Sequence, residues 1–145
     1  MKKICSLFLI LTLVSVLFIR PIKADTINYI SDKNELLEKI VEAKEDDEST
    51  IYIDKINYSG PMLLNIGNKK INIIGKDKDS GFINSNMGCI MINASLDTNE
   101  FANLKFENVS FRTELDPISL DNDYSNNMLY GISVSGGNIN LSFDN

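Results

Sequence analysis

Acidic side chains at alternate positions are the groups in this sequence whose type and spacing best suit a chemical role. Asp116, Asp121 and Asp123 lie in one polar segment of the oxygen ligands that calcium prefers, and Asp121, Asp123 and Ser125 match the first three alternate positions of a calcium loop. An EF-hand loop beginning at Asp121 would need glycine in place of Asn126 and glutamate in place of Ile132. We therefore predict that any bound calcium sits at Asp116, Asp121 and Asp123 in a site of another kind. A polar loop extending into solvent is the alternative.

Neighbouring carboxylates could also hydrolyse a glycosidic bond, because that reaction needs two acids about 5 to 10 Å apart. Three pairs have suitable spacing: Asp77 with Asp79, Asp97 with Glu100, and Asp121 with Asp123. Residues that favour turns surround each pair, so an exposed turn is the competing interpretation of every one of them. Spacing alone does not select a catalytic pair.

The residue types that the sequence lacks exclude several kinds of catalytic and metal site. The sequence contains no histidine, which excludes Ser-His-Asp and Cys-His catalysis and all histidine-metal sites. Cys5 lies in the apolar N-terminal run, so Cys89 is the one cysteine of the remaining chain. One cysteine allows neither an internal disulfide nor a zinc site built from thiolates. We predict that Cys89 is a buried thiol.

The N-terminus has the three parts of a secretory signal peptide. Lys2 and Lys3 precede an apolar run of 16 residues, Ile4–Ile19, and the small residue Ala24 follows. A membrane-spanning helix would need about 20 apolar residues. We therefore predict a cleaved signal peptide at residues 1–24 and a secreted or cell-surface protein. The frequent Lys, Ile and Asn residues indicate a bacterial source.

Cleavage would make the protein strongly acidic. The whole chain has a net charge of −6, and residues 1–24 carry four cationic side chains and no acidic one, so the remaining 121 residues would carry −10. Such a surface repels nucleic acid and anionic membranes, and we expect neither as a partner. A chain of this size can form one modest core.

The elements that must position these groups begin with one helix. Asp32, with Glu35 three residues later, is a helix-start signature. The apolar residues that follow fall on one side of a helix: Leu36, Leu37, Ile40, Val41 and Ala43. This spacing predicts an amphipathic helix of about three turns within residues 31–43. A short extended lead-in precedes it, so lead-in and helix together form the unit at residues 25–49.

From residue 50 the apolar period changes to two, which predicts strands with one buried face. Seven segments show this alternation: Thr50–Ile53, Ile71–Ile74, Cys89–Ile92, Leu104–Phe106, Val109–Phe111, Ile132–Val134 and Ile139–Phe143. Gly, Asn, Asp and Ser between them predict turns. Ile51, Ile71 and Ile90 are 20 and 19 residues apart, which indicates an imprecise repeat.

Four stretches make the sequence similar to a known family. They read NELLEKIVEAKEDDESTIYID, INIIGKDKDSGFINS, NLKFENVSF and GISVSGGNINLSF. Together they resemble the N-terminal part of right-handed parallel β-helix proteins of the pectate lyase-like superfamily, across residues 31–145. The resemblance implies an all-β fold in which residues 50–145 form a right-handed parallel β-helix of about four coils behind an N-terminal capping α-helix. A β-sandwich is the alternative fold, because short alternating strands also describe that architecture.

The resemblance implies several activities rather than one. The superfamily contains polysaccharide lyases, glycoside hydrolases, adhesins and non-catalytic proteins, so the fold does not select among them. Its lyases combine calcium with an outward Arg or Lys base. Alternation from Val109 and Phe111 turns Arg112 outward, which makes Arg112 the catalytic candidate that the resemblance implies. A surface arginine without a catalytic role is the alternative.

The leading functional hypothesis is an exported β-helix segment with a binding or structural role. Its expected partner is a polysaccharide or another surface protein, and no cofactor other than calcium is expected. Phe143 is followed by only two residues, with no capping element, so we expect a fragment of a longer protein with further coils. The alternative hypothesis is the N-terminal part of a polysaccharide lyase or glycoside hydrolase.

Overall fold

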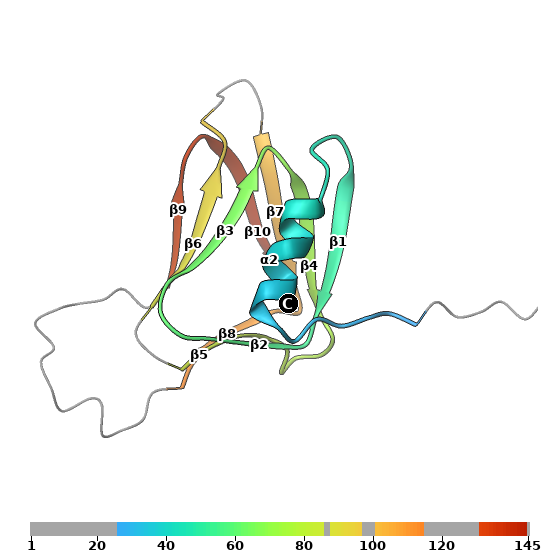
Figure 1. The fold of residues 1–145 in the computed structure, drawn as a ribbon, viewed down its shortest axis with the longest axis vertical. Coiled ribbons are helices and arrows are strands. Elements are labelled where there is room, and N and C mark those ends of the chain that lie inside the picture. The colour runs from blue at the N-terminus through green and yellow to red at the C-terminus, as the bar shows by residue number, and fades with distance from the viewer. Residues whose placement is uncertain (1–25, 86–87, 97–100, 115–130, 145) are drawn as a thin grey trace, which may run out of the picture.

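A computed structural model of the 145-residue chain describes residues 26–85, 88–96, 101–114 and 131–144. One helix, α2 (Lys33–Glu42), precedes ten strands in this part of the chain. The strands are β1 (Glu48–Ile53), β2 (Lys55–Tyr58), β3 (Met62–Gly67), β4 (Lys70–Gly75), β5 (Gly81–Asn84), β6 (Ile90–Ala94), β7 (Phe101–Glu107), β8 (Ser110–Thr113), β9 (Ile132–Ser135) and β10 (Asn138–Asp144). The predicted all-β character with a single short helix is confirmed (Figure 1).

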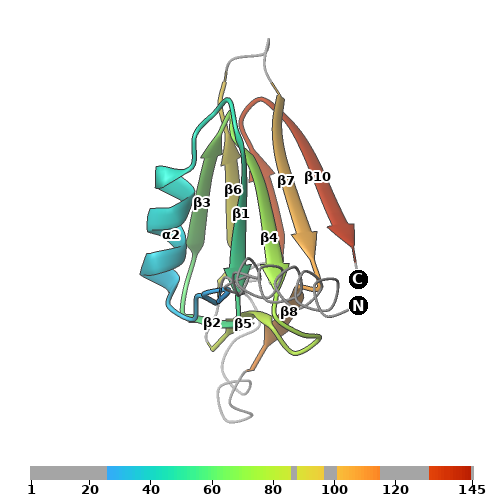
Figure 2. The same cartoon turned by 90° about the vertical axis from the view of Figure 1, so that its right-hand side faces the viewer.

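The strands form three sheets, and the chain visits these sheets in rotation. Sheet A has the order β1-β4-β7-β10, sheet B the order β2-β5-β8, and sheet C the order β3-β6-β9. All seven pairs of named strands are parallel. We call each set of three consecutive strands a layer, so β1–β3, β4–β6 and β7–β9 are three layers and β10 begins another (Figure 2). A sandwich of antiparallel sheets does not describe these strands.

Strand registers show a repeat longer and less regular than the sequence indicated. Ile51 pairs with Ile73, Ile73 with Phe106 and Phe106 with Phe143, at separations of 22, 33 and 37 residues. The expected step from Ile71 to Ile90 was wrong, because Ile71 lies in β4 of sheet A and Ile90 in β6 of sheet C. Connections of unequal length stretch the repeat, so spacing along the chain did not identify strand partners.

Five of the seven predicted segments lie within strands, and the two that begin at Cys89 and Val109 start one residue before β6 and β8. Strands β2, β3 and β5 were not predicted. In β3, Leu63 is an apolar residue on the outward side and breaks the alternation that would have identified the strand. In β5 all four residues are buried, so no alternation exists there. Hydrophobic alternation therefore fails to identify a strand where an apolar residue faces outward, or where both faces of the strand are buried.

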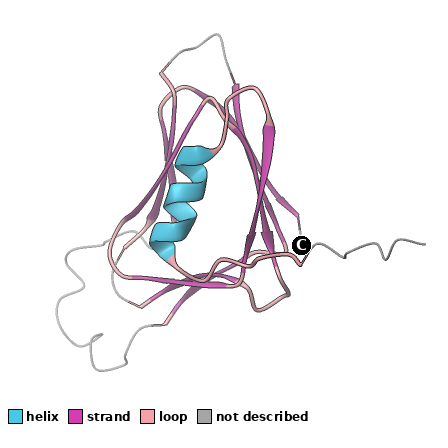
Figure 3. Cartoon of the chain, turned by 45° about the vertical axis from the view of Figure 1, so that its right-hand side comes forward, coloured by secondary structure: helices cyan, strands magenta, loops and turns pink. Residues whose placement is uncertain are grey.

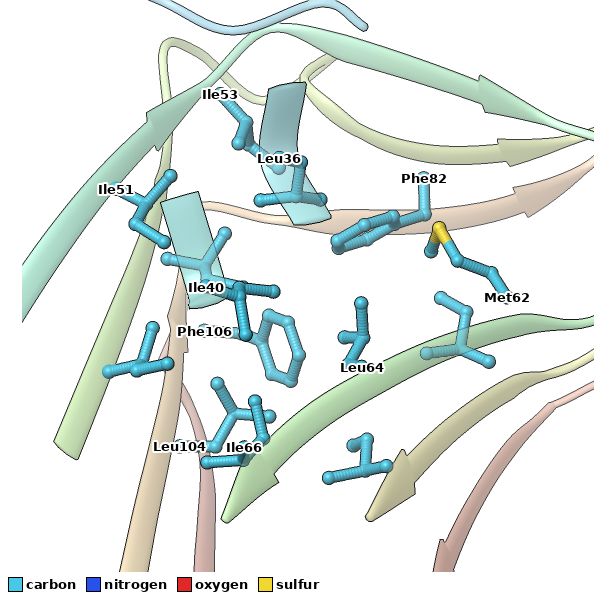
Figure 4. Packing of buried hydrophobic residues seen from close by; sticks show 14 of the residues in the cluster. Leu36, Ile40, Ile51, Ile53, Met62, Leu64, Ile66, Phe82, Leu104 and Phe106 are labelled. Atoms are coloured by element: carbon cyan, nitrogen blue, oxygen red, sulfur yellow. The ribbon is translucent and has the colours of Figure 1, made fainter. Parts of the chain in front are cut away.

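Side chains from the inner faces of the three sheets meet in one core. Phe106 of sheet A, Phe82 of sheet B and Leu64 of sheet C are each at most 1% exposed (Figure 4). The rings of Phe82 and Phe106 pack edge to face with centroids 6.0 Å apart. Aromatic contact of this kind adds about 0.5 to 1.5 kcal/mol to the burial of apolar area.

Helix α2 covers the end of this core formed by the first layer (Figure 3). Leu36 and Ile40 are fully buried there, because positions four apart lie on one helix face. Val41 is 70% exposed, so its predicted place on the buried side was wrong. One step of about 100° around the helix turns Val41 away from the line that joins Leu36 and Ile40.

Both ends of α2 are held by side chains. Asp32 Oδ1 accepts hydrogen bonds from two backbone N–H groups of the first turn, at 2.8 and 3.0 Å, as the helix-start signature predicted. At the other end Lys69 Nζ donates to the carbonyl oxygens of Ile40 at 2.7 Å and Val41 at 3.0 Å. A cation at the C-terminus also suits the helix dipole. Lys69 thereby ties the helix to the turn between β3 and β4.

Candidate functional site

The predicted calcium residues Asp116, Asp121 and Asp123 lie outside the described residues, as does the signal peptide at residues 1–24. Among the residues that are described, no group of three or more His, Cys, Asp or Glu side chains could hold a metal ion. No helix in this part of the chain is long and apolar enough to cross a membrane. The calcium and export hypotheses therefore stay predictions.

Arg112 joins two layers of the structure. It lies on β8, and its Nη2 donates to Asp79 Oδ1 at 3.1 Å and to the carbonyl oxygen of Lys78 at 3.3 Å. The ion pair is partly exposed, with 38% of the Arg112 side chain and 55% of the Asp79 side chain accessible. These contacts hold the loop after β4 against the next layer. A catalytic role for Arg112 is untested by this geometry and stays a prediction.

The pair Asp77 and Asp79, one of the three acid pairs, has a structural use in the same loop. Asp77 Oδ1 accepts from the backbone N–H of Asp79 at 2.8 Å and from Ser80 Oγ at 3.1 Å. The hydrogen bond from the backbone N–H of Asp79, followed by the one from the Ser80 hydroxyl, lowers the pKa of Asp77. A general acid for glycoside hydrolysis needs a raised pKa instead. The other two pairs lie outside the described residues.

Cys89 is less buried than the sequence predicted. It stands immediately before β6 and is half-buried rather than enclosed in the core. The reason is its position, because Ile90 and Ile92 are the buried residues in the alternation of β6 and Cys89 is one position away from Ile90. Nearby, Tyr58 and Phe111 line a cavity of about 180 Å³. Burial raises the pKa of Tyr58.

Polar side chains form two rows on the outer face of sheet A, and sequence reasoning missed them. Strand register places Lys70, Asn103 and Asn140 side by side in the first row. It places Asn72, Lys105 and Ser142 side by side in the second row. Neighbouring members of a row are separated by the strand spacing, about 4.8 Å, and the rows by two residues, about 6.6 Å.

The first row contains an ordered pair of amides. Asn140 Nδ2 donates to Asn103 Oδ1 at 2.9 Å. Both residues line a depression of about 290 Å³ together with Lys70, Lys105 and Ser142. The Asn103–Asn140 contact fixes both amide planes, and each amide group can both donate and accept hydrogen bonds.

Lys105 forms two ion pairs on this face. Lys105 Nζ contacts Asp144 Oδ2 at 2.8 Å and Glu107 Oε2 at 3.2 Å. The hydrogen bond that Lys105 donates to Asp144, followed by the one that it donates to Glu107, raises the pKa of Lys105. Asn72 Nδ2 donates to Glu48 Oε1 at 3.4 Å, at the edge of the depression. The face therefore offers amides, hydroxyls and paired charges, which suit an uncharged ligand with many hydroxyl groups.

An aromatic side chain lies beside the second row. Tyr52 is on the outer side of β1, two positions along the strand from the row that contains Asn72. Its ring packs edge to face against Tyr29 with centroids 5.9 Å apart. The alternation of outward Asn residues with inward apolar ones could have indicated a polar face, although not its rows.

Comparison with protein-family models, curated proteins and solved structures found no match to this chain.

Proposed function

We propose that this protein is a polysaccharide-binding segment of a right-handed parallel β-helix, as its resemblance to the pectate lyase-like superfamily implies. The rotation of the chain through three parallel sheets supports this architecture. We propose in addition that it is exported by its signal peptide and acts at the cell surface or in the medium, as a fragment of a longer bacterial protein. The role is binding rather than catalysis.

The paired amides of Asn103 and Asn140 carry the proposal for binding. Their hydrogen bond orders two donor-acceptor groups at the strand spacing, beside a depression wide enough for part of a sugar ring. A polymer with hydroxyl groups along its length can meet successive members of a row. Preordered polar groups lower the entropy lost on binding.

Neutral polysaccharides are the favoured ligand class. The chain has a net charge of −6, which disfavours polyanions over the whole surface. Lys105 is already neutralised by Asp144 and Glu107, so it offers little free positive charge to a uronic acid. Binding without catalysis is supported by the use of Asp77 and Asp79 in holding a loop.

The test is isothermal titration of the purified protein with a panel of soluble polysaccharides, both neutral and uronic-acid-containing. We expect a neutral polymer to bind, and we expect Asn103→Ala with Asn140→Ala to weaken that binding by about tenfold or more, equivalent to about 1.4 kcal/mol. The matched control changes Asn65 and Asn93 to Ala, because this second amide pair lies on sheet C with a 3.5 Å contact. That control should bind normally.

Two results would contradict the proposal. Equal weakening in both double variants would mean that the sheet A face has no special role. Release of shorter or unsaturated sugars during the titration would show that the protein cleaves the polysaccharide, as the enzyme hypothesis expects. Arg112→Ala would then test whether Arg112 is the catalytic base. Sequencing the N-terminus of the exported protein tests the signal peptide separately, with cleavage expected near Asp25.

A further inference from the structure

One aromatic ring points away from the core on the face of sheet A that carries the amide pair. Phe101 is the first residue of β7, a strand that lies between β4 and β10 (Figure 2). The inward places of this strand belong to Ala102, Leu104 and Phe106, each 1% exposed. Alternation therefore turns Phe101 outward on the same side as Asn103, and 55% of Phe101 is exposed.

The ring of Phe101 differs from the other exposed phenylalanine rings. Phe111 and Phe143 each stack on the ring of a buried phenylalanine, with centroids 5.4 and 5.3 Å apart. Phe101 contacts no other aromatic ring among the described residues. Its strand is paired on both sides, and a further layer would extend sheet A beyond β10 and leave the outward side of β7 open. Packing of the fold therefore does not explain why a phenylalanine occupies this position.

Ordered polar groups lie next to this ring. Asn103 is two residues further along β7, about 6.6 Å from Phe101 on the same face of the sheet. Asn103 Oδ1 accepts the hydrogen bond from Asn140 at 2.9 Å, and both amides line the depression of about 290 Å³. A flat apolar surface and fixed hydrogen-bonding groups therefore lie side by side on the outer face of sheet A.

We propose that Phe101 is the stacking platform of the polysaccharide site and that the site selects polymers of pyranose sugars whose hydroxyl groups are equatorial. This inference rests on the proposed binding function and adds the class of sugar. Such a sugar ring has two flat faces of C–H groups and an edge of hydroxyl groups. The negative face of the phenyl ring attracts the C–H groups, while the amides of Asn103 and Asn140 bind the hydroxyl groups.

The surroundings of Phe101 favour a sugar over an apolar protein surface as the ligand. An apolar partner that covered Phe101 would also cover the amides of Asn103 and Asn140 and leave their remaining donors and acceptors without hydrogen bonds. Burial of polar groups in this way costs free energy. A pyranose unit supplies an apolar face for the ring and hydroxyl groups for the amides, so it satisfies both parts of the surface.

The shape of the sugar ring sets the expected selectivity. Glucose units in a β-linked polymer have equatorial hydroxyl groups, so both faces of each unit can stack on a phenyl ring. Furanose units are smaller and puckered, and their substituents project from both faces. We therefore expect a cello-oligosaccharide to bind at least tenfold more tightly than a neutral fructofuranose oligosaccharide of the same length.

Isothermal titration of the purified protein with these two oligosaccharides tests the platform. Phe101→Leu keeps an apolar side chain but removes the flat ring, so we expect it to weaken cello-oligosaccharide binding at least tenfold and to abolish most of the selectivity. Phe101→Tyr keeps the ring and should bind normally. The matched control is Leu63→Ala, because Leu63 is 47% exposed on the outward side of sheet C. That control should also bind normally, and circular dichroism checks the fold of every variant.

Fluorescence reports contact at the ring directly. The chain contains no tryptophan, so Phe101→Trp introduces a single indole at the platform. We expect the cello-oligosaccharide to shift the indole emission to shorter wavelength, because stacking removes the indole from water. Leu63→Trp is the control and should not respond. Dilution of Phe101→Trp without sugar should leave the emission unchanged, and a shift that depends on protein concentration would overturn the proposal by showing that a second copy covers the ring.

The outcomes separate this proposal from the binding function on which it rests. If the neutral polymer binds and Asn103→Ala with Asn140→Ala weakens that binding, while Phe101→Leu binds as the unchanged protein does, the site is right and the platform is wrong. Equal binding of the cello-oligosaccharide and the fructofuranose oligosaccharide to the unchanged protein would overturn the sugar selectivity. If no neutral polysaccharide binds, the binding function and the platform are both wrong.

Discussion

At the first layer of the stack, helix α2 lies over the inner side chains and leaves Leu36 and Ile40 without solvent exposure. At the opposite end, strands β9 and β10 have the same alternating pattern but leave Val134 and Phe143 almost half exposed. The two ends differ in their covering element and not in the strands themselves. In a stack of layers, burial of an inward residue depends on the neighbouring layer as much as on its own strand.

The largest expected difference between the core and the last strands comes from the stacked rings of Phe106 and Phe143. Phe106→Ala should lower the free energy of unfolding by about 3 to 5 kcal/mol, because it leaves a cavity among buried side chains. Phe143→Ala should cost about 1 to 2 kcal/mol, since half of its surface is already in solvent. Urea unfolding of both variants measures the two losses. Equal losses would mean that Phe143 is covered as completely as Phe106.

We expect Lys69→Met, at the end of the stack covered by α2, to have an effect of intermediate size on stability. This change removes two hydrogen bonds to the last turn of α2 and should lower the free energy of unfolding by about 1 to 2 kcal/mol. The control is Lys70→Met, whose side chain lies on the outer face of sheet A, and we expect it to change stability little. Thermal unfolding compares the two variants. A similar melting temperature for both would show that α2 holds its place by apolar contact alone.

The smallest effect concerns pH and the loop that contains Asp77. The pKa of this carboxylate is lowered in the folded protein, so its charge adds stability above the ordinary value of 3.8 and loses that contribution as pH falls through the lowered pKa. Asp77→Asn should therefore be less stable than the unchanged protein near neutral pH. The difference should shrink in acid. Melting curves of both proteins from pH 7 downward measure it, and a constant difference at every pH would contradict this account.

Helix α2 and most strands were predictable, because their signals are local. Asp32 and the buried pair Leu36 and Ile40 follow from residue type and helical spacing. Val41 was placed wrongly, since one position around the helix separates a buried side chain from an exposed one. Strand β3 was missed where Leu63 faces outward, because a local pattern records hydrophobicity and not what covers it.

The candidate site was less predictable than the strands that carry it. The partner of Asn103 is Asn140, and the partner of Arg112 is Asp79, at separations of 37 and 33 residues. Spacing predicted acid pairs such as Asp77 with Asp79, but the structure uses those two acids for different contacts. Neighbours along the chain are therefore poor guides to chemistry in a protein whose strands pair across layers.

The sequence by itself determined the helix, the alternation of inward and outward residues, and the absence of histidine chemistry. These properties depend on residue type and on spacing within a few positions. Only the tertiary structure decided which outward residues share a row and which inward residues stay exposed. The physical reason is that paired residues of neighbouring parallel strands lie far apart along the chain and at unequal separations, here 22 to 37 residues along sheet A. Packing between layers therefore sets the register.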